Sequence, residues 1–550
     1  MITINSTTVA VESAAELKSV LEANNAITLI YLAKDITLTN GIDILGSKQN
    51  ITIDGLYPTD GTGSIHTYTD MNSTSTADVI GIRTPSSINI TLQNMNVVGR
   101  NYYGIIYVSE GTMHQNVVVA YSNITYTGPQ ITFHPSGLSI YKDLNIKIVA
   151  SPVAVANEIA ETFQLQIGGN TTIVHNSTVD SAFWFRGYTN NPYLEILEGA
   201  NLTITTSKDL IYTSNPVKII IDKNATFTLN TNYGVFRDSS HQASSILVDE
   251  NSSFSITQNN TNGGYATIFC RGTFNINKNA SLYIQANFVN NAPLIRLNTS
   301  NSSFNVTDPK SVILYNRNQP CFSFESTSAF SISCGKLDYW LISPTLTTTK
   351  LLTNNPLYTW YKSPQENILL TATATSARTT VASSNLTTAE SALLPNLTLL
   401  QLQTANTLRF VYIGSIDMGP VPSVIEFQRP IVNTNPVILG RKDKTITITV
   451  QDTRAFSKNW NLYAYINSDL ITQDGKHSLP DSLIFVDNNQ QIKALSKTPT
   501  LIYAGTSNNG NPKTTTITWS ENTGILFKIN KPLYNGETYS TTINWNLTDA

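Results

Sequence analysis

The middle third of the chain alternates apolar and polar residues in short runs that recur at a nearly fixed spacing. The copies are "ILEGANLTI" from Ile196, "IDKNATFTL" from Ile221, "VDENSSFSI" from Val248 and "INKNASLYI" from Ile276. Each copy has an apolar residue, two variable residues, Gly or Asn, a small residue and then an alternating run. Alternation with a period of two predicts strands that have one buried face.

Gly or Asn occupies one fixed position of this repeat. The anchors are Gly199, Asn224, Asn251 and Asn279, with weaker copies at Asn170 and Asn301, and the intervals run 29, 25, 27, 28 and 22 residues. These two residue types enter the left-handed backbone region at least cost, so we expect the strand to turn there. A period of this length predicts the coils of a parallel β-helix. "NITIDG" at Asn50 and "NITLQNMNVVG" at Asn89 are expected to be further coils.

The segment "VESAAELKSVLEANN" near the N-terminus departs from the strand pattern. Ser13 and Glu16 have the spacing of a capping box, and Leu17, Val20 and Leu21 fall on one helical face. We expect a short amphipathic helix that covers the first coil and blocks pairing of its open edge with another chain.

The pattern divides the chain into three regions. We expect a parallel β-helix over residues 1–340, a β-rich connecting region over 341–422 where the repeat fades, and a last block of strands over 423–550. "GPVPS" at 419–423 marks the second boundary, since proline and glycine interrupt regular structure. The predicted fold class is all-β: a right-handed parallel β-helix with an N-terminal capping helix, followed by a β-sandwich-like domain.

Composition narrows the function classes. Charged residues make up 13% of the chain and the net charge is -3, which excludes a broad basic surface for nucleic acid. Three cysteines, an odd and small number, argue against a disulfide framework. We find no signal peptide and no apolar run of membrane-spanning length. A cytosolic protein and a secreted protein whose leader has been removed both fit, and the composition favours the secreted one.

The tetrapeptide NWNL occurs twice, at Asn459 to Leu462 and at Asn544 to Leu547, both times in a strand-like setting. Trp and Leu two residues apart lie on the same face of a strand. Two alternatives follow. Either both pairs fill the core of a sandwich, or the indoles form part of a glycan-binding platform.

The block from about Ser423 resembles the WxL domain, a C-terminal module of surface proteins in low-GC Gram-positive bacteria. The matching stretches are "ITITVQDTRAFSKNWNLYAYI" and "GETYSTTINWNLTDA", and the paired motifs of the family fall on Trp460, Leu462, Trp545 and Leu547. The resemblance implies non-covalent attachment to the cell wall through peptidoglycan or another wall glycan. It also implies a co-encoded, membrane-anchored WxL-interacting protein as a partner.

The repeat region resembles the pectate-lyase-like adhesive domains that precede such modules. This resemblance implies a host matrix or surface ligand for the β-helix. Together the two resemblances imply a non-enzymatic surface protein that is held on the wall by its last domain.

Catalysis is the main alternative, because parallel β-helices also host polysaccharide lyases and hydrolases. A lyase needs carboxylates for calcium and a base, and a hydrolase needs two acids. The sequence contains no dense acidic cluster, and its six histidines lack metal-ligand spacing. We therefore expect no catalytic residue, metal or cofactor. An extracellular polysaccharide lyase or hydrolase stays open as the second hypothesis, and a purely structural β-helix as the third.

An apolar residue directly precedes an arginine in four solenoid segments, at Arg186, Arg237, Arg271 and Arg296. If Phe185, Phe236, Cys270 and Ile295 point inward, the arginines point outward and could stack as a column on one flank. The column is a candidate contact for an anionic glycan or a matrix protein. The alternative is that these are solvated strand arginines. In this alignment Trp184 is assigned to the core, and Cys270 is expected to be buried and unreactive.

Overall fold

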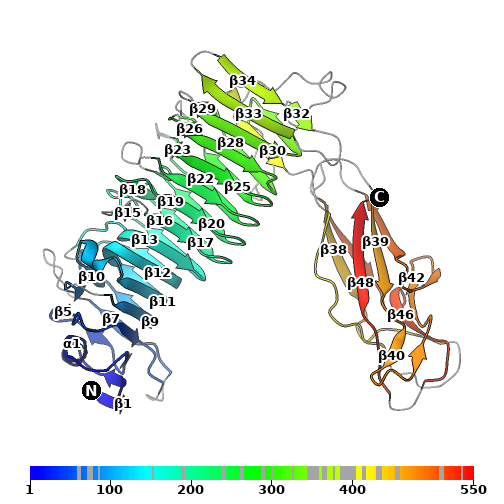
Figure 1. Ribbon diagram of the computed structural model, residues 1–550, viewed down its shortest axis with the longest axis horizontal. Coiled ribbons are helices and arrows are strands. Elements are labelled where there is room, and N and C mark those ends of the chain that lie inside the picture. The colour runs from blue at the N-terminus through cyan, green and yellow to red at the C-terminus, as the bar shows by residue number, and fades with distance from the viewer. Residues whose placement is uncertain are drawn as a thin grey trace. The chain divides into compact units, whose positions relative to one another are not determined.

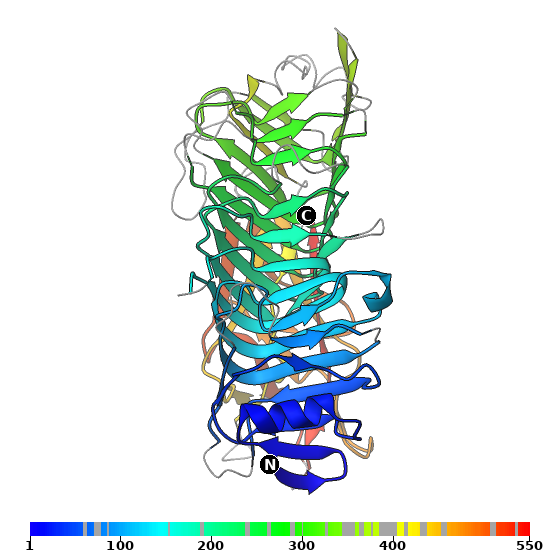
Figure 2. The same cartoon turned by 90° about the vertical axis from the view of Figure 1, so that its left-hand side faces the viewer.

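In the computed structural model, the alternating runs form parallel strands that repeat once per coil (Figures 1 and 2). The chain divides into two units, which are described separately: unit 1 is Met1–Lys362 with Asn367–Val411, and unit 2 is Ser363–Glu366 with Tyr412–Ala550. The structure describes all residues except 59–62, 71–78, 85–86, 152–153, 187–191, 237–242, 261–265, 287–291, 300, 325–327, 344–357, 362–367, 376–377, 384–403, 412–415, 429–436, 453–458, 507–512, 534–536 and 550. Only the backbone is described for 358–361, 368–375, 378–383, 411 and 549.

Unit 1 is a parallel β-solenoid of about ten turns, as the repeat predicted. Pairing between strands of successive coils arranges the strands in three columns. The first column contains β13 (Ala160–Gly168), β16 (Tyr193–Ile196), β19 (Lys218–Ile221), β21 (Ser245–Val248), β24 (Thr273–Ile276), β27 (Ser303–Thr307) and β30 (Ala329–Cys334). The second contains β14 (Asn170–His175), β17 (Asn201–Thr206), β20 (Thr226–Thr231), β22 (Ser253–Gln258), β25 (Ser281–Ala286) and β28 (Ser311–Asn316).

The turn between these two columns falls on the predicted Gly/Asn position. Gly199, Asn224, Asn251 and Asn279 have φ angles of 71°, 61°, 60° and 58°, so the left-handed turn is confirmed at all four. The weaker copy at Asn170 was aligned one residue too late, because Gly169 takes the turn with a φ of 60°. A glycine adopts this conformation at lower cost than the asparagine that follows it.

Hydrogen-bonded side-chain amides also connect neighbouring coils. The Nδ2 of Asn123 donates to Oδ1 of Asn94 over 2.9 Å, and Asn94 in turn donates to the carboxylate of Asp54 over 3.1 Å. Each such bond joins one coil to the next, and it adds to the backbone bonds of the parallel strands.

The predicted capping helix is α1 (Ala14–Glu22). The Oγ of Ser13 accepts a hydrogen bond from the N–H of Glu16 over 3.3 Å, and Leu17, Val20 and Leu21 are buried against the solenoid core. The helix and its apolar face are therefore confirmed.

Blocking of the open edge was assigned to this helix, and that assignment was wrong. An additional antiparallel strand, β1 (Ile2–Asn5), pairs with β2 (Thr8–Val11), the first strand of the solenoid. A helix cannot satisfy the row of backbone groups on a strand edge, whereas a second strand can.

Antiparallel strands from the predicted connecting region complete the other end of the solenoid. Strands β33 (Ile368–Thr375) and β35 (Thr407–Val411) pair with β30 and β28, and β35 also pairs with β31 (Lys336–Trp340). The described strands of residues 341–411 thus belong to unit 1.

Unit 2 consists of small antiparallel sheets arranged like a sandwich. Its sheets contain β36 (Ile416–Met418), β38 (Ile446–Asp452) and β45 (Lys513–Trp519); β37 (Val437–Leu439), β46 (Gly524–Ile529), β42 (Leu483–Val486) and β43 (Ile492–Ala494); β44 (Thr500–Thr506), β39 (Asn459–Ile466) and β48 (Ile543–Asp549); and β41 (Ser478–Leu479), β40 (Leu470–Thr472) and β47 (Tyr539–Ser540). Arg441 is fully buried in this unit, and its guanidinium donates to the backbone oxygens of Thr523 and Ile525 over 2.6 and 3.0 Å. No helix of the described residues is long and apolar enough to cross a membrane.

Candidate ligand-binding site

The third strand column of the solenoid presents an outward row of side chains, which we call the ladder face. It lies on β10 (Ile106–Val108), the first residues of β12 (Thr132–Ile148), the first residues of β13, β15 (Phe183–Phe185), β18 (Ile211–Thr213), β23 (Ile268–Cys270) and β26 (Ile295–Leu297). The ladder face consists of Tyr107, Phe133, Glu161, Trp184, Tyr212, Phe269 and Arg296, each flanked by residues that point into the core.

Strand register places these side chains one above another. Tyr107 is paired with Phe133, Phe133 with Glu161, Glu161 with Trp184, and Trp184 with Tyr212. Farther along, Phe269 is paired with Arg296. Paired strands are about 4.8 Å apart, so the row forms a strip along the coils.

Aromatic rings make up most of this strip. The rings of Tyr107 and Phe133 stack at 5.1 Å with an interplanar angle of 17°, and Trp184 meets Tyr212 edge to face at 5.4 Å. Tyr107, Trp184 and Tyr212 are half-buried, which leaves part of each ring accessible to a ligand, whereas Phe133, Glu161 and Phe269 are buried beneath their neighbours.

Arg186 joins three coils beside this strip. Its Nη1 lies 2.9 Å from Oε2 of Glu161 and its Nη2 lies 2.9 Å from Oε1 of Glu110. The guanidinium also lies 4.5 Å from the ring centroid of Trp184, within the range of a cation–π contact. Burial raises the pKa of Glu161, and the bond with Arg186 opposes that shift.

Further carboxyl groups lie close to Arg186. Burial, with the negative charges of Glu161 and Asp180, raises the pKa of Glu158 to about 8, and the positive charge of Arg186 opposes this shift. Burial also raises the pKa of Tyr102 to about 12, with contributions from Glu158, Glu161 and Asp180. These mutual effects place the carboxyl groups and the phenol in one neighbourhood, which we call the Glu158 site.

The expectation of no dense acidic cluster was therefore wrong. Glu158 and Glu161 are three residues apart, whereas Glu110 and Asp180 are distant from them in the sequence. The coils bring these residues together around Arg186. Only the strand register between coils could have revealed the cluster. Among the described residues, no group of three or more His, Cys, Asp and Glu side chains has the geometry of a metal site.

The arginines predicted to form one column lie at two different levels of the strands. Arg186 and Arg271 come two residues after the ladder positions Trp184 and Phe269, whereas Arg296 is itself a ladder position and faces Phe269. Both Arg271 and Arg296 lie over the ring of Phe269, at 5.1 and 5.2 Å. Arg237 is outside the described residues.

The alternation correctly placed the neighbours of these arginines, since Phe185, Phe236, Cys270 and Ile295 are all buried. Alternation reports only which face a residue is on, and it does not report the register between coils. Arg186, Arg271 and Arg296 therefore do not form the expected single column. The ligand-binding role of these arginines stays a prediction.

Trp184 was assigned to the core, and this was wrong. Residues two apart on a strand share a face, so Trp184 points outward with Arg186, and its ring lies under the guanidinium. Cys270, by contrast, is buried as expected, and burial raises the pKa of its thiol to about 12.

The two NWNL words lie on neighbouring strands of unit 2. Trp460 and Leu462 on β39 are fully buried, and the indole of Trp460 stacks on Tyr503 at 5.4 Å. Trp545 and Leu547 on β48 are half-buried and pack against the same core. Leu462 is paired with Leu547, so both words face one apolar layer.

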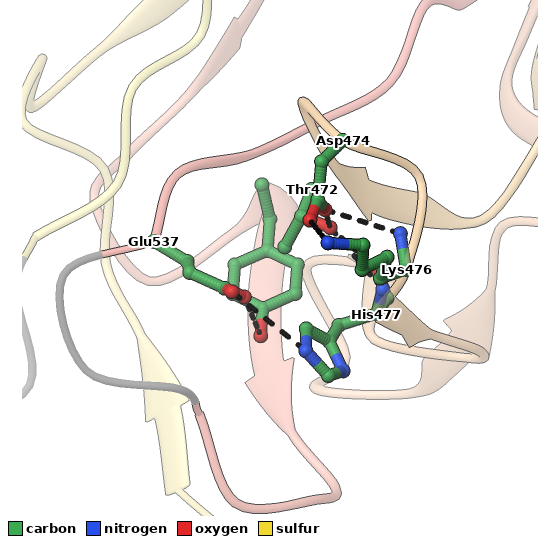
Figure 3. Close-up of polar contacts among 6 residues, drawn as sticks. Thr472, Asp474, Lys476, His477 and Glu537 are labelled. Atoms are coloured by element: carbon green, nitrogen blue, oxygen red, sulfur yellow. Dashed lines mark hydrogen bonds and ion pairs between the residues drawn. The ribbon is translucent and has the colours of Figure 1, made fainter.

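A polar cluster holds one end of unit 2 together (Figure 3). In the turn between β40 and β41, the hydroxyl of Thr472 donates to Oδ1 of Asp474 over 2.7 Å, and the Nζ of Lys476 lies 3.2 Å from Oδ2 of Asp474. Nε2 of His477 lies 3.7 Å from Oε1 of Glu537. The cluster connects this hairpin to the segment before β47.

Comparison with known families finds one match within the solenoid. Residues 8–133 match the model described as "Putative pectate lyase-like adhesive domain". The match spans 126 of the 550 residues. Its adhesive description supports a surface or extracellular protein and agrees with a non-enzymatic function.

Two solved structures are similar to the chain. The first, "L. reuteri 53608 SRRP", is 17% identical with a TM-score of 0.34, and the alignment covers 52% of this chain and 99% of that one. The second, "L. reuters 100-23 SRRP", is 16% identical with a TM-score of 0.33, and covers 55% and 84%. At these TM-scores the likeness carries no argument about function. No curated protein matches the chain.

Proposed function

We propose that the protein is a non-enzymatic surface adhesin that binds a glycan along the ladder face of its solenoid. The observation that carries the proposal is the row of side chains in register over successive coils, in which the rings of Tyr107, Trp184 and Tyr212 are partly accessible. Aromatic rings present flat apolar faces with specific packing geometry, and sugar rings can pack against such faces. The adhesive family model that matches residues 8–133 supports the same function.

Binding of the full chain to a glycan array tests this proposal. The Trp184→Ala variant removes a half-buried ring from the middle of the ladder face and is expected to lose binding. Tyr233→Ala is the matched control, because Tyr233 is a half-buried solenoid aromatic that lies off the ladder. Unchanged binding by the folded Trp184 variant would refute the ladder as the contact surface.

We further propose that unit 2 holds the protein on the cell wall through peptidoglycan or another wall glycan, with a membrane-anchored WxL-interacting protein as partner. The resemblance carried by Trp460, Leu462, Trp545 and Leu547 supports this role. Co-sedimentation with purified Gram-positive walls tests it, using the full chain, residues 412–550 and the solenoid, each checked for folding by circular dichroism. Pelleting of residues 412–550 but not of the solenoid is the expected result. The reverse would overturn the assignment.

One observation favours a second candidate, polysaccharide hydrolysis. A buried carboxyl whose pKa is raised to about 8, such as Glu158, has the protonation state that a general acid needs. Release of reducing sugar from a glycan panel, lost in Glu158→Gln, would establish this activity. Absence of product from glycans that the protein binds would leave adhesion as the function.

A further inference from the structure

The indole of Trp184 lies beside a group of side chains with more negative than positive charge. The guanidinium of Arg186 lies over the indole ring, and it forms one ion pair with Glu110 and another with Glu161. Two carboxylates against one guanidinium leave this group with an excess of one negative charge. A ligand on the accessible part of the indole therefore meets a guanidinium that is already neutralised, next to the carboxylate of Glu110, whose side chain is 33% exposed.

The phenol ring of Tyr107 has the same kind of neighbour. The guanidinium of Arg83 lies 5.4 Å from its ring centroid, and Arg83 forms an ion pair with Asp43. The side chain of Asp43 is 67% exposed, so its carboxylate faces the solvent from which a ligand would arrive. An arginine whose charge is balanced in this way packs against an aromatic ring and has little attraction left for a distant anion.

We propose that Glu110 and Asp43 make the ladder face selective for uncharged sugars over acidic ones. Their carboxylates balance the arginines beside Trp184 and Tyr107, so a neutral sugar ring can pack there without breaking a charge pair. The carboxylate of an acidic sugar at the same place is repelled by the excess negative charge beside Trp184. This inference rests on the proposed adhesion to a glycan and narrows its ligand class. For Arg186 it replaces the anionic partner that the arginine pattern predicted.

A glycan array of matched pairs tests the proposal, each pair being a neutral oligosaccharide and the same oligosaccharide with one hexose replaced by its uronic acid. We expect the full chain, at about pH 7 where a uronic acid is ionised, to bind the acidic member about five- to tenfold more weakly than the neutral one. Glu110→Gln, which keeps the shape of the side chain, should reduce this difference to about twofold. Glu250→Gln is the matched control, since Glu250 is an exposed carboxylate paired with Lys223 beside the turn between the other two strand columns.

The salt dependence of binding gives a readout that a merely structural role of Glu110 would not change. Raising the ionic strength from about 0.1 M to about 1 M shortens the Debye length from about 10 Å to about 3 Å and screens repulsion between exposed charges. The ratio of acidic to neutral affinity should therefore rise with salt in the wild type, and it should rise less in Glu110→Gln. Asp43→Asn should raise the same ratio at low salt, and because Asp43 is exposed this replacement leaves the core untouched.

Two results would overturn the inference. One is wild-type binding of the acidic members as tight as that of their neutral partners, and the other is a neutral preference that survives unchanged in both Glu110→Gln and Asp43→Asn. If acidic and neutral members bind equally well and Trp184→Ala abolishes the binding of both, the selectivity fails while glycan adhesion holds. If no member of the array binds the full chain, the proposed function fails and the selectivity fails with it.

Discussion

The two NWNL strands are identical over four residues and occupy different positions in one sheet. Strand β39 is the central strand, paired on both sides with β44 and β48, whereas β48 lies at the edge of the three-stranded sheet. As a result Trp460 is fully buried while Trp545, paired with Ala464, stays half-buried. The position of a strand in its sheet, and not the tetrapeptide NWNL itself, determines how deeply its tryptophan is buried.

The largest difference between the two strands is expected when the indole of Trp460, on the central strand, is removed. Trp460→Ala should lower the free energy of unfolding of unit 2 by about 3–5 kcal/mol, since it leaves a large cavity in a closed core. Chemical denaturation followed by tryptophan fluorescence or circular dichroism measures the loss. If Trp460→Ala lowered the free energy of unfolding no more than Trp545→Ala does, the two tryptophan positions would be equivalent.

Gly505→Ala tests the packing around the same indole. A Cβ at residue 505 would overlap the ring of Trp460, so the substitution should cost about 1–3 kcal/mol by overpacking. The melting temperature of the full chain reports this effect. Trp460→Phe in the same background should recover part of the loss, because the smaller ring leaves room for the methyl group.

Trp545→Ala should cost less, about 1–2 kcal/mol, because its side chain is only partly buried. This variant therefore stays folded and separates binding from stability, as the Trp460 variant cannot. If the second word contacts the cell wall, wall co-sedimentation should fall while the circular dichroism spectrum is unchanged. Full retention of binding would restrict the role of Trp545 to packing.

The smallest effect is expected at the asparagines of the two words. Asn461 on β39 and Asn546 on β48 point away from the apolar layer, and replacement of either by Ala should change stability by no more than about 0.5 kcal/mol. Equal, small changes in the denaturation midpoint would show that the two NWNL copies differ in stability only through their Trp and Leu side chains. A large loss for Asn461 alone would show that the outer face also distinguishes them.

The sequence was sufficient for the features that depend on local pattern. Alternation predicted the buried neighbours of the arginines, the Gly/Asn positions predicted the turns at Asn224, Asn251 and Asn279, and the capping pair predicted α1. Each of these follows from residues within one or two turns of chain.

Features that depend on register between coils were beyond the sequence pattern. The offset of Arg296 from Arg271 is set by how far each loop advances the chain before the next short strand begins. The Glu158 site is assembled from separate coils for the same reason. The outward position of Trp184 was within reach, because the period of two places it with Arg186.

The side-chain amide bonds between coils have a mechanical consequence. Both the Asn123 to Asn94 bond and the strand hydrogen bonds run from one coil to the next, so a pull along the coil axis stretches them in series. Each junction then carries the whole force, and the weakest junction yields first. Under tension the solenoid should lengthen by releasing single coils in steps, each of which can close again when the tension falls.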